Sequence, residues 1–398
     1  MKSNWETRPL GELVRFSSGG TPSKKNPKYW NGTIPWISAK TMKGERVSTS
    51  DLMITEEGLA SGSKLAPIGS LLLLTRGSGL FNGIPLCIVE RPVAFNQDVK
   101  CIESCTDVSN QFIFYWLKSQ EQYLKAKLEV TGIGAGKFDT KFLQELRVPV
   151  PPKEERDKIV AIAEAISKKI IINTKINDNL QQQAQAIYRE RFEGVASEDL
   201  PSGWRIVALG DVATISNKSF NPLKEAERML EHYSIPAFDE ARFPVFEPST
   251  SIKSNKFVIN ASCFMISKLN PTTKRVWKPY CLTENAVCST EFIVYKAKDE
   301  SITDFLYSVI DSSSFSDFMC SHVTGSTGSR QRTTPSDTLA YKVILPSEED
   351  LSEFQSLVSP MYAQMRINAI ENDKLKRLRD SLLPKLMSGE IDVSDIQL

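Results

Sequence analysis

The side chains that most clearly suggest a chemical function in this sequence are cations, and they are concentrated in two zones. Residues 1–50 contain nine Lys and Arg against three acids, and residues 251–280 contain six against none. Over the whole chain, by contrast, 49 basic residues nearly balance 48 acidic ones. Lys and Arg attract phosphates regardless of base sequence, and Arg, Lys, Asn and Gln can also read base edges. The two zones therefore predict nucleic-acid contacts at two separate places.

From these zones and nearby loops we select candidate DNA-contacting residues in each half of the chain. For any single Lys or Arg the alternative is a solvated surface charge, and the sequence does not separate base readers from phosphate contacts. Trp30 and Trp36 could stack on bases, but aromatic residues at this spacing more often pack in a core. The first set is Lys24, Lys25, Lys28, Lys40, Lys43, Arg76, Lys137 and Lys141, and the second is Lys253, Lys256, Lys274, Arg275, Lys278, Arg330 and Arg332.

Enzymatic sites need residue sets that this sequence lacks. The run from Gly132 to Lys137 does not have the glycine, lysine and hydroxyl spacing of a phosphate loop and is expected to be a flexible hinge. Thr272 after Asn270-Pro271 departs from the Asn-Pro-Pro-aromatic run of adenine methyltransferases. Seven cysteines without a Cys-x-x-Cys pair, and only two histidines, argue against zinc. We expect no catalytic residue and no metal site in this chain.

The chain contains one plan twice. The segments 5–14, 130–132 and 147–152 return in similar form as 204–213, 323–325 and 342–347. Each copy opens with about 145 residues in which short β-type runs alternate with Gly, Pro, Asn and Ser turns. A strand-rich globular unit is expected from each such segment.

Each copy then closes with a long amphipathic helix. Residues 153–193 contain no Gly or Pro, and apolar residues recur there mostly at three- or four-residue spacing. A second apolar stripe runs from Leu351 to Leu382, although Pro360 is expected to kink or interrupt its first part. A helix of roughly 60 Å cannot be covered by one small domain, so we expect the two helices to pair as an antiparallel coiled coil.

The predicted fold is therefore α+β, with two strand-rich, mixed α/β domains in pseudo-two-fold repeat and two long helices between them. The expected divisions are 1–151, 152–198 for the first helix, 199–347, and 348–398 for the second helix and tail. The apolar helix residues expected to dock partners are Ile159, Ile162, Ile166, Ile170, Leu180, Ile187, Leu375, Leu378 and Leu382.

The chain resembles the specificity subunits of type I restriction-modification systems over essentially its whole length. Residues 16–23, 29–40, 75–77 and 94–97 resemble one class of target-recognition domain, and residues 266–271, 275–277 and 289–292 resemble another. Leu382 to Ile391 is similar to the ending that commonly follows the helix of such a domain. The order of these segments, with each domain followed by a helix, is more specific than any one of them.

This resemblance implies a cytoplasmic, non-catalytic DNA-binding subunit in which each domain reads half of a split target. Because the two units carry different motifs, the target should be asymmetric. The helices would set the spacer and dock methyltransferase subunits, usually two, and a restriction and motor subunit would join them. S-adenosylmethionine, ATP and magnesium would belong to those partners, so the chain itself needs no cofactor.

Two other functions stay open at this point. A coiled-coil scaffold with two protein-binding heads would account for the helices but leave the acid-free zone without a purpose. A chain with its own nuclease or methyltransferase activity would show turnover when purified.

Overall fold

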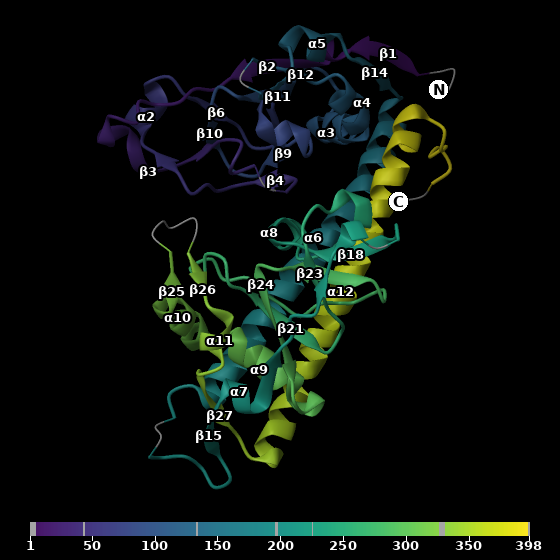
Figure 1. Cartoon of the computed structure of the whole chain (residues 1–398). Helices are drawn as coiled ribbons and strands as arrows, with labels where there is room; N and C mark the ends of the chain where they lie inside the picture. Colours follow the sequence, from purple (N-terminus) through teal and green to yellow (C-terminus); the bar gives the residue numbers. More distant parts are fainter. Residues whose placement is uncertain are drawn as a thin grey trace. The chain divides into compact units, whose positions relative to one another are not determined.

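The structure is a computed structural model that describes residues 5–42, 44–132, 134–195, 198–224, 226–325 and 331–396. Its contacts divide the chain into two compact units. Unit 1 comprises Met1–Lys169 and Leu375–Leu398, and unit 2 comprises Ile170–Lys374. Each unit thus contains one section of each long helix (Figure 1). The four-part division expected from the sequence stays a prediction.

Unit 1 is a set of small sheets covered by short helices. Its sheets are β1 (Glu6–Pro9) with β14 (Arg147–Val150); β5 (Met53–Ile54), β3 (Trp30–Ile37), β10 (Val93–Phe95) and β6 (Lys64–Ala66); β2 (Val14–Ser18), β11 (Val99–Ser104), β7 (Leu71–Leu74), β9 (Leu86–Val89) and β4 (Arg46–Val47); and β12 (Glu129–Val130), β13 (Gly136–Lys137) and β8 (Arg76–Gly77). Its short helices are α1 (Leu10–Leu13), η1 (Pro27–Tyr29), α2 (Glu56–Ala60), η2 (Ser78–Phe81), α3 (Asn110–Ser119), α4 (Glu121–Ala126) and α5 (Thr140–Glu145).

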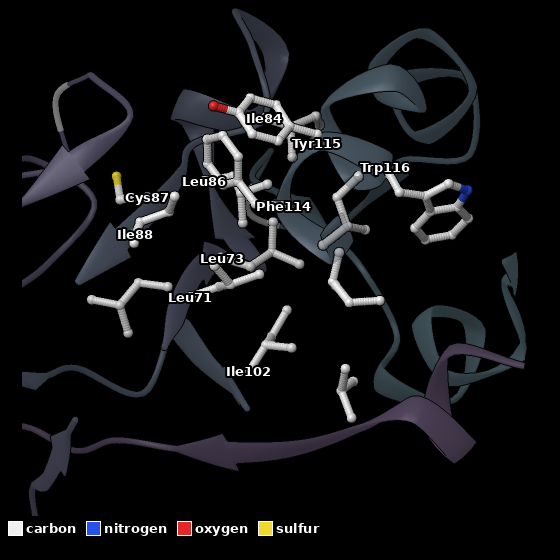
Figure 2. Packing of buried hydrophobic residues seen from close by; sticks show 14 of the residues in the cluster. Leu71, Leu73, Ile84, Leu86, Cys87, Ile88, Ile102, Phe114, Tyr115 and Trp116 are labelled. Atoms are coloured by element: carbon white, nitrogen blue, oxygen red, sulfur yellow. The ribbon is translucent and has the colours of Figure 1, made fainter. Parts of the chain in front are cut away.

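The core of unit 1 forms where α3 covers the sheet that contains β7 and β9. Leu71 and Leu73 of β7 and Phe114 of α3 are at most 1% exposed, and Figure 2 shows their side chains gathered in one cluster. Strands buried on both faces read as continuous apolar runs, which is why β7 is four consecutive leucines. This packing holds the strand ends that carry the candidate site.

Unit 2 has a strand plan similar to that of unit 1, although the described residues form sheets of two, five, four and two strands in place of two, four, five and three. Its sheets are β15 (Arg205–Ala208) with β27 (Lys342–Leu345); β17 (Ser219–Phe220), β20 (Lys256–Val258), β23 (Ala286–Ser289), β18 (Met229–Tyr233) and β19 (Val245–Pro248); β16 (Ala213–Ile215), β24 (Phe292–Ala297), β21 (Cys263–Ser267) and β22 (Val276–Trp277); and β25 (Val323–Thr324) with β26 (Arg332–Thr333). Its short helices are α7 (Leu209–Val212), η3 (Pro222–Lys224), α8 (Ile235–Ala241), η4 (Ser249–Ser251), η5 (Glu300–Ile302), α9 (Thr303–Ile310), α10 (Ser313–Ser321) and α11 (Pro335–Thr338).

The internal repeat is visible in single hydrogen bonds. The indole N–H of Trp5 donates to Glu155 over 3.3 Å, and that of Trp204 donates to Asp350 over 2.7 Å. Each acceptor lies in the first turn of a long helix, where an acid also favours the helix dipole. The repeated tryptophans therefore tie the start of each unit to the helix that closes it.

The two long helices are α6 (Lys153–Phe192) and α12 (Glu348–Ser388). They run antiparallel, because the start of α6 packs with the end of α12 in the unit 1 core and the reverse holds in unit 2 (Figure 1). The predicted fold class, including this helix pair, is confirmed. None of the described helices combines the length and apolar character that a membrane span requires.

The predicted interruption at Pro360 is wrong, because α12 continues through it. Pro360 removes one backbone N–H, but it lies on the exposed side, where water can satisfy the carbonyl group left without a partner. Val358 and Tyr362, which flank it, are buried in the unit 2 core and hold the helix in place.

Amide side chains fill the seam between the helices in unit 2. Asn173 is 1% exposed and donates to Glu371 over 2.7 Å and to Asn372 over 3.0 Å. Asn368 donates to Asn177 over 2.8 Å. Buried amides that find their partners in only one register specify that register, as an Asn at a coiled-coil core position does.

We expect Asn173→Ala to destabilise the protein by about 1–3 kcal/mol, because the buried Asn173 amide and its bonds to Glu371 and Asn372 are lost. The measurement is the free energy of unfolding in urea. Asn179→Ala is the matched control, since Asn179 is exposed and accepts only from Gln183 within the described residues, and it should change stability by less than about 0.5 kcal/mol. Equal effects of the two substitutions would contradict a specific role of the seam.

Candidate nucleic-acid interface

The loop between β2 and β3 presents the first cationic residues of unit 1 on a tightly built base. The Gly20 N–H donates to the carbonyl oxygen of Phe95 over 2.9 Å. A β-carbon at Gly19 would collide with the same carbonyl group, and one at Gly20 would collide with the carbonyl group of Gly62. Only glycine permits this approach of three backbone segments.

Two tryptophans hold this loop in place through hydrogen bonds to its backbone carbonyl groups. Trp36 donates its indole N–H to the carbonyl of Gly20 over 3.0 Å, and Trp30 donates to the carbonyl of Ser23 over 3.2 Å. Their rings meet edge to face with centroids 5.4 Å apart, and Trp36 is 5% exposed. Trp36 is thus a packing residue, as its spacing indicated. Together the pair positions Lys24, Lys25 and Lys28, which are all exposed.

Further polar residues meet at one edge of unit 1, where several strands end. The strands β3 and β10 are parallel, so Lys40 after β3 and Gln97 after β10 lie at the same edge. Thr75 joins this edge because its N–H donates to the carbonyl of Asp98 over 2.8 Å. Its own carbonyl accepts from Phe138 over 2.9 Å, which brings β13 alongside.

We define the unit 1 edge as Lys40, Arg76, Gln97 and Lys137, all of which are exposed. Arg76 and Lys137 are directly opposed across β8 and β13. Like charges in this position repel each other, and an anion between them would relieve the repulsion. Glu129 is directly opposed to Lys137 on its other side, across β12 and β13, but among the described residues no carboxylate lies within ion-pair distance of Lys40, Arg76 or Lys137.

Lys141 and Lys43 are the remaining candidates of unit 1 and are not part of the edge defined above. Lys141 is exposed and lies 3.9 Å from Glu145, one turn further along α5. Lys43 falls outside the described residues. Both stay predictions.

In unit 2 the predicted cationic zone is partly neutralised by acids from distant parts of the chain. The segment 251–280 contains no acid in its sequence, but folding brings aspartates from elsewhere in the chain beside three of its cations. The pairs are Lys274 with Asp311 at 2.8 Å, Arg275 with Asp239 at 2.7 Å, Lys278 with Asp304, and, outside the zone, Arg332 with Glu291 at 3.0 Å.

Lys256 was predicted to contact DNA, and this prediction is wrong. It is 5% exposed, and its ammonium donates to the carbonyl of Ser254 over 3.0 Å and to the hydroxyl of the same residue over 2.6 Å. Burial lowers the pKa of this amine. A buried amine whose donors are already used stabilises the turn before β20 and cannot reach a phosphate.

Other exposed cations of unit 2 were missed from the sequence. Lys253 precedes β20 and is exposed, and its contact with DNA stays a prediction. Lys224 is exposed at the end of η3, which packs on η4, and η4 ends two residues before Lys253. Arg228 is also exposed and stacks over the ring of Phe220 at 4.9 Å. Lys224 and Arg228 lie outside both dense zones, so a count of charges along the sequence does not reveal them. Arg330 falls outside the described residues.

Comparison with known proteins identifies the family. Residues 2–182 match the family described as "Type I restriction modification DNA specificity domain". The MjaIX specificity subunit of Methanocaldococcus jannaschii is 24% identical over 99% of this chain and 95% of its own length. The EcoR124I/EcoR124II specificity subunit of Escherichia coli is 32% identical over 47% of each chain. The N-terminal part of this chain therefore matches that domain family, and the chain as a whole is similar to type I restriction-modification specificity subunits. A solved specificity subunit from M. genitalium shares the fold, with a TM-score of 0.53, 16% identity and coverage of 98% of this chain and 97% of that one.

The two long helices bury some of the residues predicted to dock partners. Ile159 is fully buried in the unit 1 core, so its assignment to partner docking is wrong. Ile162 and Leu382 pack against the same core, and Ile187 packs against that of unit 2. Their apolar periodicity therefore serves the subunit's own folding. Ile166, Ile170, Leu180 and Leu375 are half-buried, and their docking role stays a prediction.

Other apolar helix residues are free to meet a partner. Leu378 is 47% exposed, and its role in docking stays a prediction. Ile172 and Ile176 are 52% and 41% exposed and, with Leu180, line a shallow groove of about 290 Å³ on α6. These two isoleucines were not selected from the sequence, because the spacing of the stripe does not show which side faces α12.

No group of three or more His, Cys, Asp and Glu side chains suited to a metal ion occurs within the part of the chain that the structure describes. His232 is 9% exposed and its Nδ1 lies 2.7 Å from a carboxylate oxygen of Glu247. Burial lowers the pKa of this imidazole, although the hydrogen bond to the Glu247 carboxylate acts in the opposite direction.

We expect Gly20→Ala to destabilise the subunit by about 1–3 kcal/mol, because the new methyl group would displace the backbone at Gly62. The measurement is urea unfolding of the whole chain. Gly132→Ala is the control, since a β-carbon there meets nothing within 4 Å, and it should have little effect. A stable Gly20→Ala protein would show that the loop is not held as described.

Proposed function

We propose that this specificity subunit selects the DNA target of a type I restriction-modification complex, with each unit reading one half of an asymmetric, bipartite site. The observation that carries the proposal is that two units with one strand plan present different side chains at corresponding places. In unit 1 the edge cations lack acidic partners among the described residues, whereas in unit 2 Arg332 is bound to Glu291. Different surfaces on one frame suit different half-sites, whereas two identical readers would favour a palindrome.

The subunit acts without chemistry of its own in this proposal. Modification subunits, two in number, would bind the helix pair and supply S-adenosylmethionine-dependent methylation. Restriction and motor subunits would supply ATP- and magnesium-dependent cleavage. The exposed isoleucines of α6 and Leu378 of α12 support docking on the helices, because solvent-exposed apolar side chains in such a groove are costly without a partner.

The experiment is methylation mapping by sequencing in a host that carries the modification subunits, with and without this chain. A split, asymmetric methylated motif that depends on the chain is the expected result. Protein capture by the two units without any chain-dependent motif would favour a scaffold, and methyl-donor- or metal-dependent turnover by the purified chain would favour an enzyme.

The unit 1 edge predicts a salt effect. Lys40→Gln, Arg76→Gln and Lys137→Gln together should flatten the dependence of log affinity on log salt by up to about 3, since each lost phosphate contact contributes about 0.9. The measurement is fluorescence anisotropy of the complex on its target at several salt concentrations. Lys153→Gln is the control, because Lys153 already pairs with Asp157 at 2.9 Å on the helix, and an equal effect there would contradict the assigned edge.

The helix pair predicts a spacer effect. Inserting about one turn, roughly four residues, after Lys169 in α6 and after Lys374 in α12 leaves the amide seam of unit 2 in register. The two helices lengthen by ~6 Å, so we expect methylation mapping to show a longer spacer between unchanged half-sites. A changed half-site sequence with the old spacer would contradict the role of the helices as a ruler.

A further inference from the structure

The backbone frame around the unit 1 edge recurs in unit 2, bond for bond. In unit 1, Thr75 donates its N–H to Asp98 over 2.8 Å and accepts from Phe138 over 2.9 Å. In unit 2, Lys268 donates its N–H to Glu291 over 2.9 Å and accepts from Thr333 over 3.1 Å. Thr75 therefore corresponds to Lys268, and Asp98 corresponds to Glu291.

The residues just before Asp98 and Glu291 agree with this correspondence. The N–H of Asp98 donates to the Asn96 side chain over 3.2 Å, and that of Glu291 donates to the Ser289 side chain over 3.2 Å. In both units a parallel strand pair precedes this turn, β3 with β10 and β18 with β23. The residue directly before Asp98 is Gln97, and the residue directly before Glu291 is Thr290, so these two residues occupy corresponding positions.

Gln97 is exposed, and its side chain is held in one orientation. The Thr21 hydroxyl donates to Gln97 Oε1 over 2.6 Å. Thr21 itself lies in the loop that Trp36 holds through Gly20. This bond leaves the Gln97 amide NH2 free to donate and leaves Oε1 a second lone pair to accept. A donor and an acceptor side by side match the N7 and N6 groups of adenine in the major groove.

The surroundings of Gln97 suit a base contact. Arg76, Lys137 and Lys40 belong to the same unit 1 edge and would hold the phosphates of the bound DNA. The carboxylate of Asp98, which would repel phosphates, is held by the side-chain amide of Asn96 at 3.2 Å. Thr290 at the matching place is half-buried and offers a hydroxyl and a methyl group instead of an amide.

We propose that Gln97 determines specificity by reading an adenine in the half-site of unit 1, and that Thr290 occupies the base-reading position of unit 2. This inference rests on the proposed function, since it assigns the residue that discriminates bases within it. Thr21 is a positioning residue in this account, because it acts through the Gln97 amide.

The test is methylation mapping with the intact complex of this chain and its modification subunits, comparing wild type with Gln97→Ala. We expect one A·T position in one half-site to become degenerate, with discrimination reduced roughly tenfold to a hundredfold, and the other half-site to be unchanged. Thr290→Val should alter only the other half-site. Gln122→Ala, at an exposed glutamine on α4, is the control and should leave the motif unchanged.

Three outcomes would overturn the inference. These are a wild-type motif in Gln97→Ala, a relaxed position in both half-sites, or a uniform loss of methylation in a variant that melts like wild type. Thr21→Val gives an independent readout, since it should relax the same position as Gln97→Ala by a smaller factor. If the wild-type complex itself shows no motif that depends on this chain, the proposed function fails, which is a different result from a failure at Gln97.

Discussion

Pairing of the two long helices through buried amides is the constraint on which the rest of this molecule depends. Two apolar stripes could slide past each other by a turn at modest cost, but amides buried with their partners tolerate only one register. Asn173 bonds Asn372, and Asn177 bonds Asn368. The offset that relates Glu155 to Asp350 also relates Asn173 to Asn368 and Asn177 to Asn372. The amides on both helices of the seam therefore come from corresponding positions of the two repeats.

The repeated frame also separates what is shared by the units from what differs. The shared part is backbone, seen in the Trp5 and Trp204 bonds and in the turns at Thr75 and Lys268. The different part is side chain, seen where Gln97 stands in one unit and Thr290 in the other. Such a division allows new recognition to arise by substitution at loop positions while the scaffold is kept.

Much of this architecture could be predicted from the sequence because it rests on periodic and repeated signals. The absence of Gly and Pro in 153–193 and the return of Trp5 as Trp204 were sufficient for the helices and the two units. Whether an individual Lys or Arg is paired with an acid could not be predicted in the same way. Asp239, Asp304 and Asp311 lie outside the acid-free segment, and only the tertiary fold brings them to Arg275, Lys278 and Lys274.

The sites that were missed or wrongly assigned share one cause, which is that the sequence does not show tertiary packing. Apolar spacing finds the helix but does not distinguish Ile159, which is buried in a core, from Ile172, which is exposed. Gln97 is uncharged and thus invisible to a search for basic clusters, although it lies within a segment that resembles the family. Two features of the sequence could have indicated Gln97. It follows an apolar run directly, and the corresponding position of the second copy carries a different residue, Thr290.

The most direct test of this account is to make the two readers identical. A chain in which residues 205–345 are replaced by a second copy of 6–150 keeps both graft ends at matched strand pairs, since Glu6 pairs with Val150 and Arg205 with Leu345. Methylation mapping with the modification subunits should then show a palindromic motif made of the unit 1 half-site twice. An asymmetric motif that still contains the original second half-site would contradict the claim that the units read the DNA.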